Sequence, residues 1–307
     1  MKSFLKNISG INKTSLYVKE ELEKIKVLMS QPMVQNIIQL KTPVRSFKEI
    51  EFSAFSQWGD DGIIQYLIEK LEINNETFIE FGVSNYLESN TRFLLLNNNW
   101  RGLVLDGSKS NIDYILNDTI SWKFDITAKH LFITKSNINQ TLIANGFEGE
   151  IGILHIDIDG NDYWLWDSIE VVNAKIVIME YNSVFGNKAA ISVPYQDDFF
   201  VSDAHFSNLY FGASLKAMCH LAKLKGYSFV GSNSHGNNAY FVQTHLLNEW
   251  VQLKTADEGY INCNFRQNRD KDGKFTLKRD EEMIHQCGDL DVIDVISNIK
   301  SPLKNFL

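Results

Sequence analysis

Acidic and amide side chains follow several short apolar runs of the sequence, at the points where those runs end. Each run has the length of a buried strand, and parallel strands all end at one edge of a sheet, where α/β proteins bind their ligands. We therefore expect these polar groups to form one site. They are Glu80 with Gly82, Asp106, Asp125, Asp157 with Asp159, and Glu180 with Asn182.

The first two of these groups suit a cofactor that contains adenosine. Glu80 and Gly82 would form a turn at which the backbone can approach a ligand closely. Asp106 follows about one strand–helix–strand unit later, where a carboxylate can accept hydrogen bonds from both ribose hydroxyls. A dinucleotide is disfavoured, because the stretch Gly82-Val83-Ser84-Asn85-Tyr86-Leu87 lacks the later glycines that seat a pyrophosphate. S-adenosylmethionine (SAM) has no phosphate and carries a positive sulfonium, so it fits an acidic loop better.

The apolar runs alternate with helical patterns, which favours an α/β fold. We expect a Rossmann-like, mostly parallel sheet with helices on both faces. The expected strands are 77–81, 102–105, 122–125, 151–158, 175–179, 227–230 and 239–242. The expected helices are 63–68, 90–97, 108–116, 135–144, 163–172 and 213–225.

Three regions are expected along the chain. Residues 1–52 form an N-terminal helical extension, in which the spacing over 15–40 indicates one or two amphipathic helices for packing or for a homodimer. Residues 53–250 form the main domain. It carries an irregular, aromatic-rich insertion over about 183–211 that is typical of a lid, and its aromatics fit packing and sugar stacking equally. Residues 251–307 form a C-terminal tail that packs on the domain.

The order of the motifs resembles the SAM-dependent methyltransferases of the FkbM-like group over roughly residues 55–245. The resemblance rests on Glu80-x-Gly82, Asp106, Asp125, the stretch His155-Ile156-Asp157-Ile158-Asp159-Gly160-Asn161-Asp162, and the entry Ser56-Gln57-Trp58-Gly59-Asp60-Asp61-Gly62. It implies the methyltransferase fold, with the loop after Glu80 at the amino-acid end of SAM, Asp106 at the ribose, and Asp125 with Ile126 at the adenine. The expected cofactor residues are Gln57, Glu80, Gly82, Ser84, Asn85, Asp106, Gly107, Ser108, Asp125, Ile126 and Asp157.

A divalent metal is a further candidate for this edge of the sheet. Asp159, Glu180 and Asn182 end neighbouring expected strands, and oxygen ligands of this kind suit Mg²⁺ or Mn²⁺. The stretch Asp159-Gly160-Asn161-Asp162-Tyr163 is also similar to metal-dependent sugar O-methyltransferases, although Tyr181-Asn182 departs from the second carboxylate of that pattern. Asp159, His205 and His235 are the candidate catalytic residues, and either histidine is a candidate general base if no metal is bound.

The composition of the chain limits the classes of partner that we expect it to bind. A net charge of -8 disfavours nucleic acid, no run approaches the roughly 18 apolar residues of a membrane span, and three cysteines without C-x-x-C spacing indicate a cytoplasmic protein. We expect an O-methyltransferase for a hydroxyl of a sugar or sugar-derived unit, in cell-surface polysaccharide (capsule or lipopolysaccharide) or secondary-metabolite biosynthesis. The alternatives are a methyltransferase for a phosphoramidate or other non-sugar acceptor, and a non-catalytic, Rossmann-like nucleotide-binding module.

Overall fold

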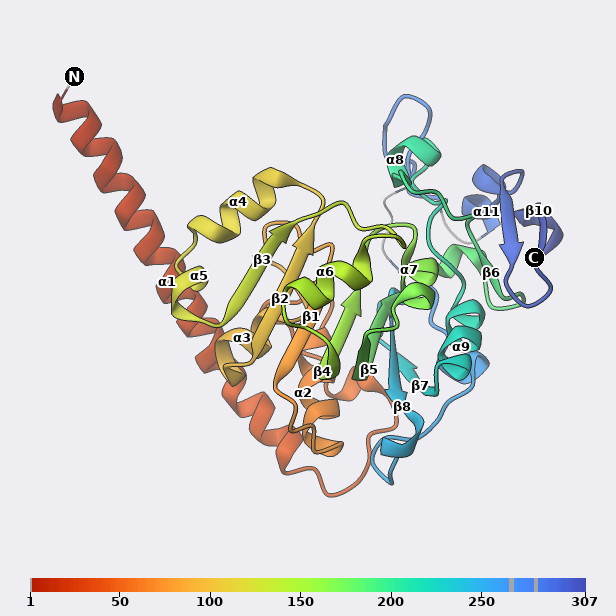
Figure 1. Ribbon diagram of the computed structural model, residues 1–307, viewed down its shortest axis with the longest axis horizontal. Helices are drawn as coiled ribbons and strands as arrows, with labels where there is room; N and C mark the ends of the chain where they lie inside the picture. Colours follow the sequence, from red (N-terminus) through yellow and green to blue (C-terminus); the bar gives the residue numbers. More distant parts are fainter. Residues whose placement is uncertain (1, 265–267, 279–280) are drawn as a thin grey trace.

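Seven strands form one twisted sheet in the computed structural model, which describes residues 2–264, 268–278 and 281–307 (Figure 1). The strand order is β3-β2-β1-β4-β5-β8-β7, and β1 to β5 are parallel whereas β8 is antiparallel to both of its neighbours. The strands are β1 (Thr77–Phe81), β2 (Arg101–Asp106), β3 (Ile126–His130), β4 (Gly149–Ile156), β5 (Val172–Glu180), β7 (Tyr227–Ser232) and β8 (Asn238–Gln243). The predicted α/β class and mostly parallel sheet are confirmed.

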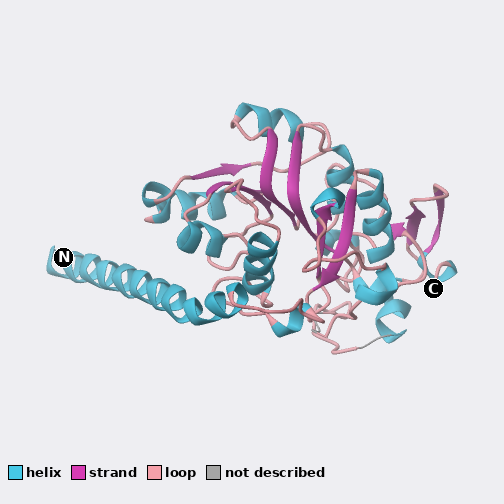
Figure 2. Cartoon of the chain, turned by 90° about the horizontal axis from the view of Figure 1, so that it is seen from below, coloured by secondary structure: helices cyan, strands magenta, loops and turns pink. Residues whose placement is uncertain are grey.

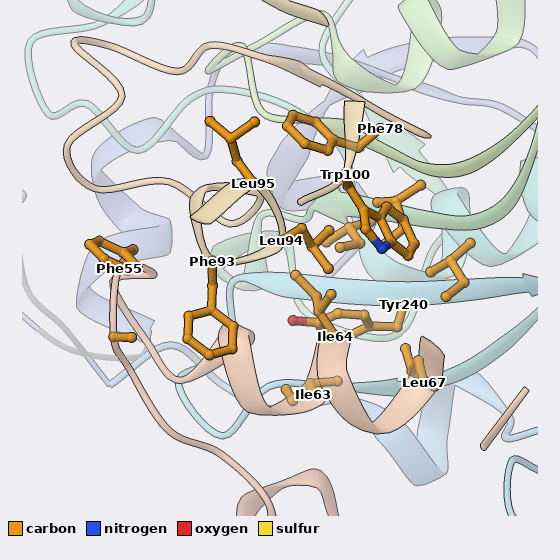
Figure 3. Packing of buried hydrophobic residues seen from close by; sticks show 14 of the residues in the cluster. Phe55, Ile63, Ile64, Leu67, Phe78, Phe93, Leu94, Leu95, Trp100 and Tyr240 are labelled. Atoms are coloured by element: carbon orange, nitrogen blue, oxygen red, sulfur yellow. The ribbon is translucent and has the colours of Figure 1, made fainter. Parts of the chain in front are cut away.

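Helices cover both faces of the sheet, and each face has its own apolar core (Figure 2). In β1, the side chain of Phe78 belongs to one core and that of Ile79 to the other, because successive residues of a strand point to opposite faces. Figure 3 shows the first core, where Ile64, Phe93 and Tyr240 come together from a helix, a second helix and a strand. The helices on this face are α1 (Lys2–Ile38), α2 (Asp60–Lys70), α3 (Arg92–Asn98), α4 (Lys109–Asn117) and α5 (Ile120–Lys123). Those on the other are α6 (Ile138–Ala144), α7 (Asp162–Ser168), α9 (Leu215–Leu224) and α10 (Ala256–Gly259).

The strand expected over 122–125 is a helix. Its residues fall in α5 and the turn after it, and the third strand begins only at Ile126. The apolar residues alternate here as they do in a strand, but Trp122 is 73% exposed and so does not contribute to the core. Asp118 accepts a hydrogen bond from the backbone N–H of Ile120 at 3.1 Å, and this local contact satisfies a donor in the first turn of the helix.

The segment after β5 and the C-terminal tail form a small unit together. Strand β6 (Ile191–Ser192) pairs with β9 (Asp291–Asp294), which pairs with β10 (Ile299–Pro302), so that the sheet joins residues about one hundred positions apart. A third apolar core holds the unit together, with Phe199 from the expected lid and Val292 and Leu303 from the tail. The short helices α8 (Val201–Ala204) and α11 (Glu281–Cys287) belong to the same two segments.

The N-terminal helix α1 is longer than expected. It is one continuous helix from Lys2 to Ile38, and its N-terminal part stands away from the sheet in both views (Figures 1 and 2). Among the residues that the structure describes, no helix combines the length and apolarity needed to span a bilayer.

Candidate functional site

Two adjoining cavities open at the carboxyl ends of the parallel strands. Strand β1 lies between β2 and β4, so the chain reverses direction across the sheet there, which is where open α/β sheets bind ligands. Each cavity has a volume of about 420 Å³. Gly82, Ser84, Asp157 and Asp159 line both, so one ligand can extend from the first cavity into the second.

The first, or apolar, cavity is formed by the loops after β1, β2, β3 and β4 and by part of the segment 183–211, which we call the lid after its expected role. Leu131 and Phe132, which follow β3, line it together with Phe199 and Phe200. Its polar groups are few and are supplied by the loops after β1, β2 and β4. Its lining is Gly82, Ser84, Leu105, Asp106, Gly107, Ser108, Asn111, Leu131, Phe132, Ile133, Asp157, Ile158, Asp159, Asn161, Phe199, Phe200 and Val201. A flat, largely apolar group with one polar edge would fit such a cavity.

Asp106 is the buried carboxylate at the wall of the apolar cavity. One of its oxygens accepts the backbone N–H of Ser84 at 2.7 Å. The other accepts the backbone N–H of Ser108 at 2.8 Å and the side-chain amide of Asn111 at 3.1 Å. These bonds fix the carboxylate at the end of β2 and tie the loop after β1 to the loop after β2.

The second, or polar, cavity is lined by hydrogen-bonding side chains. They are Gln57, Trp58, Asp60, Glu80, Glu88, Ser89, Asn90, His155, Asp157, Asp159, Glu180, Asn237 and Asn238, together with Gly82, Val83 and Ser84. At its floor, the carboxylate of Glu80 meets the Nδ1 of His155 at 2.9 Å. Burial favours the neutral form of each group, but their mutual hydrogen bond and charge lower the pKa of Glu80 and raise the pKa of His155. The two therefore form a buried ion pair.

Asp60 also lines the polar cavity. It is fully buried and accepts hydrogen bonds from the amides of Asn238 at 2.9 Å and Asn233 at 3.1 Å, and from the hydroxyl of Tyr240. Because β8 runs antiparallel, the beginning of that strand, with Asn238, lies at the same edge as the ends of the parallel strands. Sequence reasoning missed this set. The signal that could have found it was the polar Asn233-to-Asn238 stretch just before an apolar strand.

Three carboxylates converge where the two cavities meet. Asp157, Asp159 and Glu180 each have an oxygen within 4.8 Å of those of the other two. Removal from water, followed by repulsion from Asp159, raises the pKa of Asp157 to about 8. Removal from water likewise raises the pKa of Asp159, and it raises that of Glu180 with a further contribution from Asp157. Such a cluster holds protons or a cation at neutral pH.

The raised pKa of Asp157 predicts how stability depends on pH in buffer without divalent metal. Between about pH 4 and about pH 8 the folded protein keeps a proton that the unfolded chain gives up, so the free energy of unfolding falls as pH rises. The asparagine of the Asp157→Asn variant cannot ionise. The free energy of unfolding of the variant, relative to that of the natural chain, is therefore expected to rise by at least ~2 kcal/mol between pH 5 and pH 8, since one pKa unit corresponds to about 1.4 kcal/mol. Urea unfolding at the two pH values measures this, and an equal advantage at both would contradict it.

Ten of the expected site residues line these cavities. Gly107, Ser108 and Asp106 line the apolar cavity and Gln57, Glu80 and Glu180 the polar one, while Gly82, Ser84, Asp157 and Asp159 line both. Asn85 lines neither, and its side-chain oxygen accepts the backbone N–H of Leu87 at 3.2 Å. Leu131, Phe132 and Ile133 were missed.

The expected contact of Asp125 and Ile126 with an adenine ring is wrong. Ile126 pairs with Gly102 near the start of β2, so both residues lie at the amino end of the strands, opposite the cavities. Asp125 instead lies 3.9 Å from Arg101, with its side chain 72% exposed. The error follows from the misplaced third strand, whose carboxyl end is His130 and not Asp125.

Asn182 is not available as a metal ligand. Its side-chain amide donates to the carbonyls of Leu209 at 2.8 Å and Phe211 at 3.0 Å, and its oxygen accepts the N–H of Val184 at 3.0 Å. The side chain is buried and holds the lid segment on the end of β5. The cluster of candidate ligands contains Asp157 in place of the expected Asn182.

Neither candidate histidine lines a cavity. The Nδ1 of His205 lies 2.7 Å from the hydroxyl of Ser207, on the lid. The ring of His235 stacks on Trp58, which lines the polar cavity, with 4.4 Å between ring centroids. The histidine in the polar cavity is His155, and its pairing with Glu80 occupies one ring nitrogen.

No family model matches the chain, and no curated protein matches it. Solved structures match parts of it. A carbon methyltransferase named DszA has 13% identity and a TM-score of 0.39 over 60% of this chain, which spans 53% of that protein. The O-methyltransferase from Bacillus cereus in complex with S-adenosylhomocysteine (SAH) has 9% identity and a TM-score of 0.39, covering 69% of this chain and 89% of that one. The N-terminal domain of EvdMO1 with SAH bound has 8% identity and a TM-score of 0.39, covering 69% and 94%. At such TM-scores the chemistry of this chain has to follow from its own site.

Proposed function

We propose that the chain is a SAM-dependent O-methyltransferase whose acceptor is an uncharged hydroxyl compound such as a sugar unit. The observation that carries the proposal is the pair of cavities joined at Gly82, Ser84, Asp157 and Asp159. The adenosine of SAM would occupy the apolar cavity, with its ribose hydroxyls toward Asp106. The methionine end and the acceptor would share the polar cavity.

The charges of the site support a cationic cofactor. Six carboxylates line the polar cavity, and among the described residues that line the two cavities there is no lysine or arginine. The sulfonium and ammonium groups of SAM would be attracted to this lining, whereas the pyrophosphate of a dinucleotide would be repelled and would find no cationic partner. The same reasoning weighs against an acceptor that presents a phosphate or phosphoramidate to the site.

The arrangement also supports an acceptor hydroxyl. In methyl transfer the acceptor oxygen forms a bond to the methyl carbon, the carbon–sulfur bond breaks to give SAH, and the hydroxyl proton leaves. Asp159 lines both cavities, and its raised pKa makes it a stronger base at neutral pH than an ordinary aspartate. We assign Asp159 the role of the base that accepts the hydroxyl proton. The amides of Asn237 and Asn238 and the ring of Trp58 are suited to holding a polyol, through hydrogen bonds and an aromatic face.

The carboxylate cluster fits a divalent metal as well. Asp157, Asp159 and Glu180 supply hard oxygen ligands, and the Oε2 of Glu180 is buried without a hydrogen-bond partner among the described residues. Mg²⁺ or Mn²⁺ bound by these three would orient the acceptor and lower the pKa of its hydroxyl. A cytoplasmic role in polysaccharide or secondary-metabolite synthesis is part of the same proposal.

Calorimetric titration of the whole chain with SAH, with and without Mg²⁺ or Mn²⁺, tests the proposal. Micromolar binding is expected, and ATP and NAD⁺ are expected not to bind under the same conditions. Binding of a nucleotide without SAH binding would instead favour the non-catalytic module. If SAH binds, neutral glycosides are the acceptors to test first, with nucleotide sugars as the charged comparison.

Replacing Asp106 with alanine should weaken SAH binding. A lost hydrogen bond to a charged group is worth about 1–3 kcal/mol, which corresponds to roughly 5- to 150-fold in affinity. Asp125→Ala, at the opposite end of the sheet, should leave the affinity unchanged. Equal affinity of the natural chain and a folded Asp106→Ala variant, judged by urea unfolding, would show that the ribose binds elsewhere.

A further inference from the structure

Polar side chains of the helix α1 contact the body of the protein, beside Val27 and Val34, which pack against the first core. Glu23 pairs with the buried Arg92 at 2.7 Å, and Gln31 donates to Asn97 at 2.6 Å. Lys19 pairs with Asp118. Charged and amide contacts thus hold the helix in place along this part of its length, together with a few apolar ones.

The opposite side of α1 carries an apolar stripe that faces water. Four residues, which we call the outward stripe, form it: Val18, Leu22, Ile25 and Met29, which are 48%, 55%, 49% and 68% exposed. Their spacing of four, three and four residues is that of the a and d positions of a heptad repeat, which align on one face of a helix. Several apolar side chains exposed together along one face of a helix form a patch of the kind that marks an interface.

We propose that the outward stripe is the contact through which a second copy of this chain binds, with the two α1 helices side by side and parallel. The stripe lies on the side of α1 that the body leaves exposed, and the N-terminal part of the helix projects beyond the sheet (Figures 1 and 2). A second α1 helix supplies the same apolar spacing and buries both stripes together.

The charges beside the stripe select the parallel orientation. With Val18 and Ile25 at d positions, Glu21 lies at a g position on one border and Lys26 at an e position on the other. In a parallel pair, Glu21 lies beside Lys26 of the second copy, since g and e residues five positions apart meet across the seam. In an antiparallel pair like borders meet, so Glu21 would not lie beside Lys26 of the second copy.

The same charges argue against a lipid surface as the occupant. Helices that lie on membranes carry mainly lysine and arginine next to their apolar side, because most membranes are negatively charged. Glu21 borders the stripe on one side, and the whole chain has a net charge of -8. A second copy of the chain satisfies both the apolar spacing and the charges.

Sedimentation of the full chain at micromolar concentration tests the proposal. The natural chain is expected to have at least twice its single-chain mass of 35.2 kDa. The double variant Leu22→Glu with Ile25→Glu keeps good helix-forming residues and is expected to weaken association at least 100-fold, leaving single copies. Leu224→Glu alters a leucine of α9 that is 70% exposed, and it should have no effect. A natural chain of single-copy mass, or a double variant that still associates, would overturn the proposal.

Oxidative cross-linking tests the orientation. In a parallel pair, equivalent residues of the stripe face one another, so Ile25→Cys is expected to form an interchain disulfide that the natural chain and Leu224→Cys do not form. An associated Ile25→Cys chain that fails to cross-link would overturn the parallel arrangement. The stripe would instead bind a membrane surface if the natural chain is a single copy that floats with phosphatidylcholine–phosphatidylserine vesicles, and if Leu22→Glu with Ile25→Glu abolishes this flotation. That outcome would overturn the proposal.

Discussion

Asp159→Asn is expected to reduce methyl transfer at least 100-fold while SAH binding changes by no more than a few-fold. The lost effect is that of a general base, which contributes about 10²- to 10⁴-fold. Asparagine is the better replacement here, because Asp159 has a positive φ of 54° and asparagine tolerates this left-handed conformation. The variant therefore removes the charge of the carboxylate without forcing the loop after β4 to move.

The measurement is turnover of a neutral glycoside acceptor together with calorimetric SAH affinity. Asp125→Asn is the matched control, since it makes the same chemical change on an exposed residue at the amino end of the strands. Unaltered turnover in Asp159→Asn would remove Asp159 from the reaction. Loss of SAH affinity together with turnover would place Asp159 at the cofactor instead of at the acceptor.

The sheet could be predicted because its strands are short apolar runs bounded by polar residues. Such runs indicate both the strand and the edge at which its last residue lies, which is why Asp106 and Asp157 could be assigned to one site from the sequence. The prediction is wrong where a helix of one turn has the apolar spacing of a strand. In α5 the exposed Trp122 lies two residues from the buried Ile120, and periodicity over so few residues does not separate the two structures.

The remaining differences come from contacts between distant parts of the sequence. Whether Asn182 is free to bind a metal depends on carbonyl groups near residue 210, which the lid brings back to β5. Likewise, Asn238 joins the site only because β8 is antiparallel, and Phe199 joins it because the C-terminal tail supports the lid. No local pattern encodes these pairings. Sequence therefore identified the carboxylates that follow strands better than the amides and aromatics that complete the cavities.

Gly82→Ala is expected to lower the free energy of unfolding by about 3 kcal/mol or more and to abolish measurable SAH binding. Gly82 has a φ of 76°, and a β-carbon there would lie 1.6 Å from the carbonyl oxygen of Asp157. Because the obstacle is backbone, the loops after β1 and β4 would have to separate, and these two loops form the junction of both cavities.

Gly107→Ala separates this effect from a general intolerance of the site to a methyl group. Gly107 also lines the apolar cavity, but its β-carbon would come no nearer than 3.4 Å to the flexible ring of Phe132. Urea unfolding and SAH titration should therefore leave Gly107→Ala close to the natural chain and Gly82→Ala far from it. If Gly82→Ala is destabilised yet binds SAH normally, the close approach of the two loops serves the fold alone, and the cofactor would have to bind away from Gly82. Normal stability of Gly82→Ala would contradict the prediction, because it would show that the loops after β1 and β4 can separate without cost.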